Sequence, residues 1–108
     1  MYFDARFHTA WIAKLPKGIP VIVTGDFNTG PDGEAHKELT ASLKDAWETA
    51  PKREGPADTF HNFTGKPTKR IDWILSSGVT AKSVETITTS KDGRYPSDHF
   101  PVQATFEL

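Results

Sequence analysis

The sequence predicts an α/β fold of two layers, with two helices on one side of a mixed or antiparallel sheet. Two apolar stripes predict the helices: apolar residues recur at helical spacing over residues 2–15 and again over residues 34–43. A third observation predicts the sheet, since about five short segments are β-branched or alternate apolar with polar residues. The 108 residues suffice for a single domain, residues 1–108, that buries about two-thirds of its unfolded surface.

The composition is typical of a soluble globular domain, with 36% hydrophobic and 25% charged residues. A net charge of −1 argues against a protein that binds nucleic acid through overall charge. The lack of cysteine excludes disulfides and thiolate metal sites. Because no apolar run approaches the roughly 20 residues of a membrane span and no signal peptide is visible, we expect no membrane association and favour a cytoplasmic location.

The chain begins with a predicted helix and a predicted strand. The helix over residues 2–15 has an apolar stripe, formed by Phe3, Phe7, Ala10, Trp11 and Leu15. Residues 16–18 end it with Pro and Gly, and residues 19–24 form the strand. Three consecutive apolar residues at 21–23 predict that both faces of this strand are covered.

A second helix is predicted over residues 34–43, with Asp32 as its N-cap. Its apolar face carries Ala35, Leu39 and Leu43. Residues 48–58 are rich in Pro, Gly and charge, which predicts a loop.

The rest of the chain predicts the remaining strands. After a short extended segment at 59–63, strands are expected over residues 70–75, 79–89 and 102–108. The pair Asp92-Gly93 signals a tight turn between the last two strands.

Several polar residues follow or interrupt these strands, where a buried sheet gives way to exposed loops: Asp26, Asn28, His61, Asp72, Asp98 and His99. Carboxylate and amide oxygens suit hard cations such as Mg²⁺ or Mn²⁺. A cationic histidine beside a carboxylate can stabilise charge on phosphoryl oxygens, and a second carboxylate can take a proton from water. The structural alternatives are Asx-turns at Asp26 and Asn28 and, for Asp72, a structural ion pair or hydrogen bond, with Arg70 as a candidate partner.

Three motifs in this order resemble the endonuclease/exonuclease/phosphatase superfamily, which has the deoxyribonuclease-I-like fold. They are Gly25-Asp26-Phe27-Asn28 after an apolar strand, Arg70-Ile71-Asp72-Trp73-Ile74 within a strand, and Ser97-Asp98-His99-Phe100-Pro101-Val102 before the last strand. The segment Thr59-Phe60-His61 resembles the family's segment before the second motif, so the resemblance spans essentially the whole chain.

The resemblance implies hydrolysis of phosphate esters that depends on Mg²⁺ or Mn²⁺. It implies that Asp26 orients or deprotonates the attacking water, that Asn28 binds a phosphoryl oxygen, and that His99 stabilises the transition state. Asp72 would support the histidine network or the phosphate pocket, and Asp98 would assist the metal or pair with a histidine. The candidate catalytic residues are therefore Asp26, Asn28, Asp72, Asp98 and His99, the candidate substrate contacts Asn28, His61 and Arg70, and the candidate metal ligands Asp26 and Asp98.

The resemblance covers only the C-terminal half of the family's domain, which is a four-layer αββα sandwich of two α/β halves. The family's first half supplies an Asn, the main metal-binding Glu and a His that have no counterpart in this sequence. We therefore expect a two-layer half-domain with an incomplete site and a bare apolar sheet face. A homodimer that packs sheet on sheet would cover that face.

Two other functions remain open. The chain is in one case a catalytically silent half-domain that acts only as a self-associating module. In the other it is a nucleic-acid-binding module, which rests on four cations near the motifs, Lys66, Lys69, Arg70 and Arg94. For an active enzyme, the sequence leaves the substrate open among nucleic acid, lipid and small phosphate esters.

Overall fold

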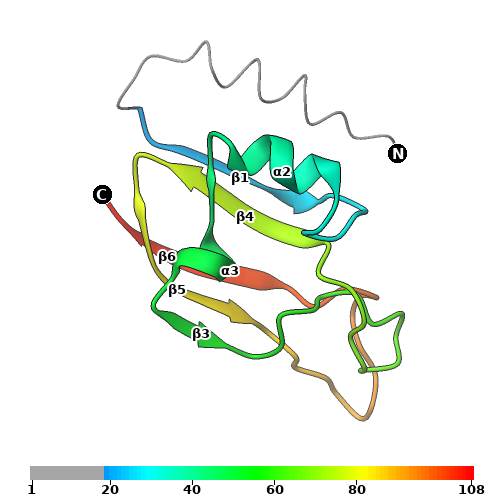
Figure 1. Ribbon diagram of the computed structural model, residues 1–108. Coiled ribbons are helices and arrows are strands. Elements are labelled where there is room, and N and C mark those ends of the chain that lie inside the picture. Colours follow the sequence, from blue (N-terminus) through cyan, green and yellow to red (C-terminus); the bar gives the residue numbers. More distant parts are fainter. Residues whose placement is uncertain (1–18) are drawn as a thin grey trace.

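The computed structural model describes residues 19–108, so the helix predicted over residues 2–15 lies outside the described part. Figure 1 shows the strands side by side with both helices on the viewer's side of them. The elements in chain order are β1 (Val21–Asp26), α2 (Glu34–Thr40), β2 (Lys44–Asp45), α3 (Ala46–Thr49), β3 (Lys52–Glu54), β4 (Asp72–Ser77), β5 (Thr80–Thr86) and β6 (Val102–Glu107). The mixed α/β class predicted from the sequence is thus confirmed.

The strands form two three-stranded sheets that meet where β4 lies beside β6 (Figure 1). In the first sheet, of order β1-β4-β2, β1 runs antiparallel to β4. This register places Asp26 directly opposite Asp72. Because opposite residues in an antiparallel pair project to the same face, two carboxylates from distant parts of the sequence become neighbours.

The second sheet has the order β3-β5-β6. Because β3 lies within residues 48–58, the prediction of a loop over that range is wrong for these residues. Asp45 caps α3 by accepting a hydrogen bond from the Trp47 amide at 3.0 Å, and β3 then pairs in parallel with β5. The residues of β3, Lys52 to Glu54, are all exposed. An exposed, charged edge strand has the composition of a loop, which explains the wrong prediction.

Helix α2 covers one face of the first sheet. Its Leu39 packs with a cluster of buried residues from the neighbouring elements, namely Phe27, Leu43, Trp73 and Leu75. The helix ends at Thr40, earlier than predicted, and its N-cap is Gly33 with no side-chain cap bond, so the prediction of Asp32 as N-cap is wrong. None of the helices within residues 19–108 is both long and apolar enough to cross a membrane.

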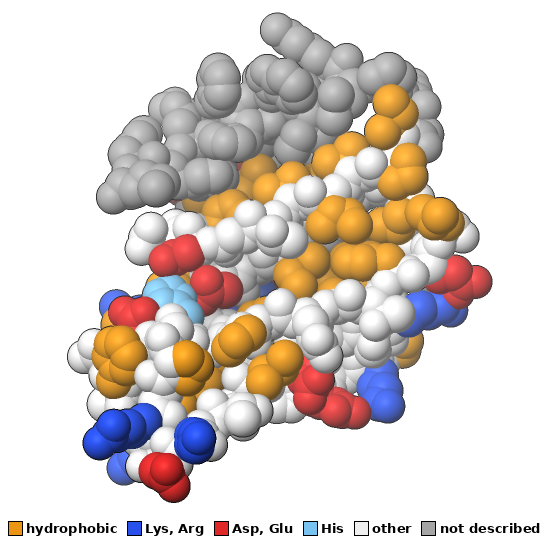
Figure 2. Space-filling view, turned by 180° about the vertical axis from the view of Figure 1, so that it is seen from behind, with side chains coloured by type: hydrophobic (Ala, Val, Ile, Leu, Met, Phe, Trp, Pro, Cys, Tyr) orange, Lys and Arg blue, Asp and Glu red, His pale blue; other side chains and the backbone are white. Residues whose placement is uncertain are grey.

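The opposite face of β1 is not covered by residues 19–108. Ile22 has 51% of its surface exposed, so the expectation that both faces of this strand are covered is wrong for the described part of the chain. Figure 2, a view from behind, shows hydrophobic side chains gathered across the middle of that side of the molecule. On β6, residues of alternating position (Val102, Ala104 and Phe106) are only partly buried.

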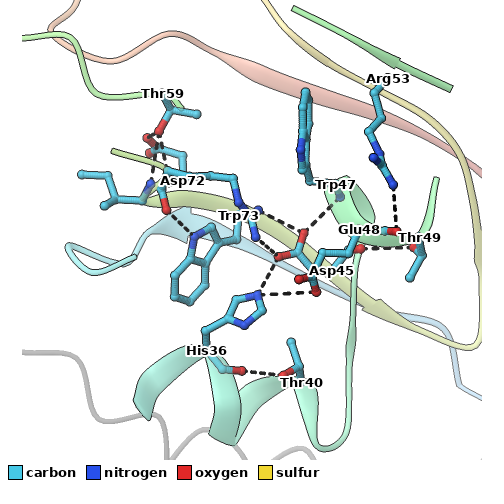
Figure 3. A network of polar contacts seen from close by, with 12 residues as sticks. His36, Thr40, Asp45, Trp47, Glu48, Thr49, Arg53, Thr59, Asp72 and Trp73 are labelled. Carbon is cyan, nitrogen blue, oxygen red and sulfur yellow. Dashed lines mark hydrogen bonds and ion pairs between the residues drawn. The ribbon is translucent and has the colours of Figure 1, made fainter. Parts of the chain in front are cut away.

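A buried network of charges joins α2, α3 and the start of β4 (Figure 3). Asp45, which is 1% exposed, lies 2.7 Å from the His36 Nε2 atom and 2.8 Å from the Arg70 guanidinium. Arg70 contacts both oxygens of this carboxylate, and its carbonyl accepts a hydrogen bond from the Trp73 indole at 2.9 Å. Arg70 therefore pairs with Asp45 and not with Asp72. The hydrogen bonds that the same alternative allowed for Asp72 are present, with Thr59 and His99.

Candidate active site

Polar residues of all three motifs meet at His99, with Asp26 from the first motif and Asp72 from the second beside it. Its Nδ1 atom lies 2.7 Å from Oδ2 of Asp72, and its Nε2 atom lies 3.6 Å from Oδ2 of Asp26. The two carboxylates come from opposite positions of β1 and β4, and the histidine comes from the loop before β6. The antiparallel register and this loop thus place the imidazole between two carboxylates.

Thr59 fixes the Asp72 carboxylate. Its hydroxyl donates to Oδ2 of Asp72 at 2.5 Å and accepts from the backbone amides of Ile71 and Asp72 at 3.4 and 3.3 Å. The side chain is buried, with 1% of the residue exposed. Thr59 therefore joins the segment before the second motif to the carboxylate that contacts His99 (Figure 3).

Asp26 uses its two oxygens for different contacts. Oδ1 accepts a hydrogen bond from the Asn28 amide at 2.9 Å, and Asn28 has a left-handed φ of 55°. This is the Asx-turn that the structural alternative predicted. Because Oδ2 is the atom that faces His99, the turn orients the carboxylate and leaves one oxygen for chemistry. Asn28 itself is exposed beside it.

Asp98 lies at the margin of this group. Its Oδ1 atom is 3.9 Å from the His99 Nε2 atom, and 43% of its side chain is exposed. Its carbonyl accepts from the amides of His61 and Asn62 at 2.9 and 3.2 Å, and the Ser97 hydroxyl accepts from the His99 amide at 3.1 Å. These bonds hold the loop that presents both residues.

The carboxylates around His99 favour its protonated form. Burial by itself lowers the pKa of His99, but the hydrogen bond to Asp72 and the charges of Asp72, Asp26 and Asp98 outweigh it. The net effect raises the pKa above its ordinary value of 6.5. The imidazole can therefore act as a cation beside an anionic substrate near neutral pH.

The donor set at this edge fits a divalent cation. Asp26, Asp72 and His99 each offer one ligand atom, and these atoms lie within 4.8 Å of one another. Asp72 is engaged by Thr59 and His99, whereas the side chains of Asp26 and Asp98 are 41% and 43% exposed. Mg²⁺ commonly takes one or two protein carboxylates and completes its octahedron with water and substrate oxygens. Asp26 and Asp98 could hold such an ion.

Two predicted site residues lie elsewhere. Arg70 is 8% exposed, and its guanidinium is held by Asp45 in the buried network. His61 is 2% exposed and stacks on Phe100, with ring centroids 4.1 Å apart. It lies behind the loop that carries Asp98 and His99, because its amide bonds the Asp98 carbonyl.

The sequence analysis missed two residues that organise the site. Thr59 was noted only as part of a segment that resembles the family, and nothing in its position indicated a bond to Asp72. Asp45 lies in the segment that leads into the predicted loop and received no role, although an Asp followed three residues later by Glu48 is a helix-start signal. A second acidic group, His36, Asp45 and Glu48, has metal-ligand spacing, but Arg70 already neutralises Asp45.

Comparisons with known proteins identify the family of this chain. An Endonuclease/Exonuclease/phosphatase family model matches residues 1–99. The uncharacterized protein YbhP of Escherichia coli strain K12 is 34% identical over 99 residues, which cover 91% of this chain and 37% of that protein. The chain thus spans little more than a third of the curated relatives that it matches.

Solved structures resemble the fold over a similar share of their length. A mannosyl-6-phosphatase of Bacteroides thetaiotaomicron VPI-5482 is 29% identical with a TM-score of 0.85, over 96% of this chain and 44% of that one. An endonuclease/exonuclease/phosphatase of Bacteroides vulgatus is 33% identical with a TM-score of 0.81, over the same two shares. The predicted partial domain of a phosphoesterase-type fold is therefore confirmed, and the chain belongs to the endonuclease/exonuclease/phosphatase family.

Proposed function

We propose that this chain contributes the catalytic residues of a phosphoesterase, in which water attacks a phosphate ester and its P–O bond to the alcohol breaks. The observation that carries the proposal is the His99 imidazole held between Asp72 and Asp26 at 2.7 and 3.6 Å. A fixed cation flanked by a carboxylate with one free oxygen suits an anionic substrate and a water nucleophile. Family membership and the similar phosphatase support the same reaction class.

Asp26 and Asn28 act on the nucleophile and the phosphoryl group. The Oδ2 atom of Asp26 orients the water and takes its proton as the new P–O bond forms. The side-chain carboxamide of the exposed Asn28, whose backbone N–H is held in the Asx-turn, donates to a phosphoryl oxygen. Both side chains therefore act at the end of β1, where the sheet holds their backbone.

His99 stabilises the negative charge that develops on the phosphoryl oxygens, and Asp72 is its positioning residue. A carboxylate on Nδ1 fixes the ring orientation and leaves Nε2 to donate. Thr59 restrains that carboxylate in turn. Preorganised donors of this kind contribute about 10²–10³-fold to kcat.

A divalent cation, Mg²⁺ or Mn²⁺, is the proposed cofactor, with Asp26 and Asp98 as its protein ligands. When bound, such an ion polarises the phosphoryl group and neutralises charge on its oxygens. This role is consistent with the exposed carboxylates of both residues.

The decisive experiment measures hydrolysis with and without Mg²⁺ or Mn²⁺. The substrates are mannose 6-phosphate and p-nitrophenyl phosphate as monoesters and bis-p-nitrophenyl phosphate as a diester. Turnover should require the cation and should fall at least 100-fold in Asp26→Ala and His99→Ala. The surface variant Glu54→Gln on β3 is the matched control and should retain activity.

If the intact chain hydrolyses none of these substrates, with or without the cation, the result would instead support the second candidate, a silent self-associating half-domain. We propose for either case that a second copy covers the face that carries Ile22, which is 51% exposed. An apolar sheet face of this kind is commonly covered by a two-fold related copy.

A further inference from the structure

A cavity adjoins His99, and Asp26 is not among the residues that line it. It has a volume of about 810 Å³, and its walls come from the segment between β5 and β6 and from His61. Cavities of about 300–1,000 Å³ are the usual size of small-molecule sites. The size therefore fits the remainder of a small phosphate ester better than a long polymer.

His99 lines two neighbouring cavities. It lines the larger cavity, and it also lines a cleft of about 280 Å³ over Asp26 and Asp72. Ser97 and Phe100 border both spaces as well. A substrate whose phosphate lies against His99 in the cleft therefore has its alcohol portion directed toward the larger cavity.

The inner wall of the cavity is aromatic and fixed. His61 lies between Phe100 and Tyr95, with ring centroids 4.1 and 4.7 Å away. The Gly65 amide donates to His61 Nδ1 at 3.3 Å, so the hydrogen of the neutral ring is on Nε2. Among residues 19–108 this buried Nε2 atom has no hydrogen-bond partner. A buried donor without a partner is costly, so this wall carries an unsatisfied polar group.

The outer rim of the cavity carries two cations in a fixed arrangement. Lys91 and Arg94 exchange backbone hydrogen bonds of 3.0 and 2.9 Å across a tight turn at Asp92 and Gly93, whose φ angles are 53° and 73°. Residues that face each other across such a turn project their side chains to the same side, and both line the cavity.

These cations are not neutralised by the structure. Asp92, at the tip of the turn, is the sole carboxylate among the described residues that line the cavity. Neither Lys91 nor Arg94 has an ion-pair partner within residues 19–108. In Figure 2 a group of blue side chains lies below the pale-blue histidine and the red carboxylates around it, with one red carboxylate directly below the blue group.

We propose that the cavity is a subsite for a second anionic group on the alcohol part of the substrate, held by Lys91 and Arg94. The inference rests on the proposed function and narrows its substrate class to small esters with an additional phosphate. The scissile phosphate occupies the cleft at His99, the carbon skeleton lies against the aromatic wall, and the second phosphate lies at the turn.

The test compares mannose 6-phosphate with mannose 1,6-bisphosphate in the full chain. The double variant Lys91→Gln/Arg94→Gln removes both charges but keeps the backbone bonds of the exposed turn, so it should fold normally. The control, Lys52→Gln, removes a cation on β3, where Lys52 pairs with Glu54 at the surface. We measure kcat/KM for both esters, and binding by calorimetry in the Asp26→Asn background, which prevents turnover during the titration.

The intact chain should bind and cleave the bisphosphate at least tenfold better than the monophosphate, because a charged hydrogen bond is worth about that factor. The double variant should lose this preference, and Lys52→Gln should keep it. No preference in the intact chain, or a preference that survives in the double variant, would overturn the subsite even if hydrolysis is observed. A charge-dependent binding preference without any turnover would instead leave the subsite intact and refute the proposed function.

Discussion

The Thr59 hydroxyl lies 2.5 Å from Oδ2 of Asp72, the same carboxylate oxygen that His99 contacts. Replacing the hydroxyl by a methyl group in Thr59→Val should reduce kcat about tenfold and leave KM nearly unchanged, because Thr59 acts on His99 only through Asp72. The free energy of unfolding should fall by about 1–3 kcal/mol, since the amides of Ile71 and Asp72 lose their acceptor.

Steady-state kinetics and urea unfolding test this prediction. Thr105→Val, at an exposed position of β6, is the control and should change neither quantity. A loss of stability with unchanged kcat would mean that Thr59 is merely structural.

The protonation of His99 gives a second prediction, for the chain without divalent cations. The pKa of His99 lies above 6.5, chiefly because the Asp72 bond and three carboxylates overcome the effect of burial, so Asp72→Asn should lower it. The folded state keeps its proton at a pH where the unfolded chain has released it. This contribution to stability is therefore complete below 6.5 and is lost as the pH rises through the raised folded pKa.

Titration of the histidine ring signals by NMR measures this pKa in the intact chain and in Asp72→Asn. Glu54→Gln, on the distant strand β3, should leave the titration of His99 unchanged. A pKa that does not fall in Asp72→Asn would refute the assigned role of the carboxylate.

Two ion pairs of similar length should contribute differently to the free energy of unfolding, because the pair between Asp45 and Arg70 is buried and the pair between Glu107 and Lys82 is exposed. Asp45→Ala should destabilise the fold by about 3–5 kcal/mol, because it leaves the buried Arg70 charge uncompensated. Glu107→Gln breaks an exposed pair with Lys82 at 2.7 Å and should change stability little, since water screens that pair. Urea unfolding of both variants gives the comparison, and similar losses would contradict the structural role of the buried network.

Cation binding can be measured without any substrate. Saturating Mn²⁺ should raise the Tm of the intact chain, since an ion that binds only the folded state stabilises it by mass action. Asp26→Asn and Asp98→Asn should each reduce this rise, and Glu54→Gln should not. Thermal unfolding followed by calorimetry would detect the shift, and an equal rise in all variants would place the ion elsewhere.

The exposed face of β1 predicts self-association. Light scattering at tens of micromolar should give twice the chain mass of 12.0 kDa. Ile22→Glu should reduce it to the monomer mass, because a charge cannot be buried unpaired in the interface. Phe63→Glu, at a residue 59% exposed in a loop, is the control and should remain a dimer. A stable monomer of the intact chain would exclude the homodimer.

Local patterns in the sequence were sufficient to predict the longer strands of the two sheets. The strands at 19–24, 70–75, 79–89 and 102–108 correspond to β1, β4, β5 and β6, with bounds that differ by up to three residues. The Asp92-Gly93 turn is also present, as its positive φ angles show. The sequence failed for β3 and α3, because elements of three and four residues are too short to show a periodic apolar face.

The sequence by itself determined the family, since the three short motifs and their order can be recognised without a structure. It also identified Asp26, Asp72 and His99 as candidates. Only the tertiary structure decided how these groups meet, because the register of β1 against β4 and the loop before β6 set their distances. It also assigned Arg70 to Asp45, a partner 25 residues away that no local pattern indicates. Pairings between distant segments depend on packing, which a linear pattern does not record.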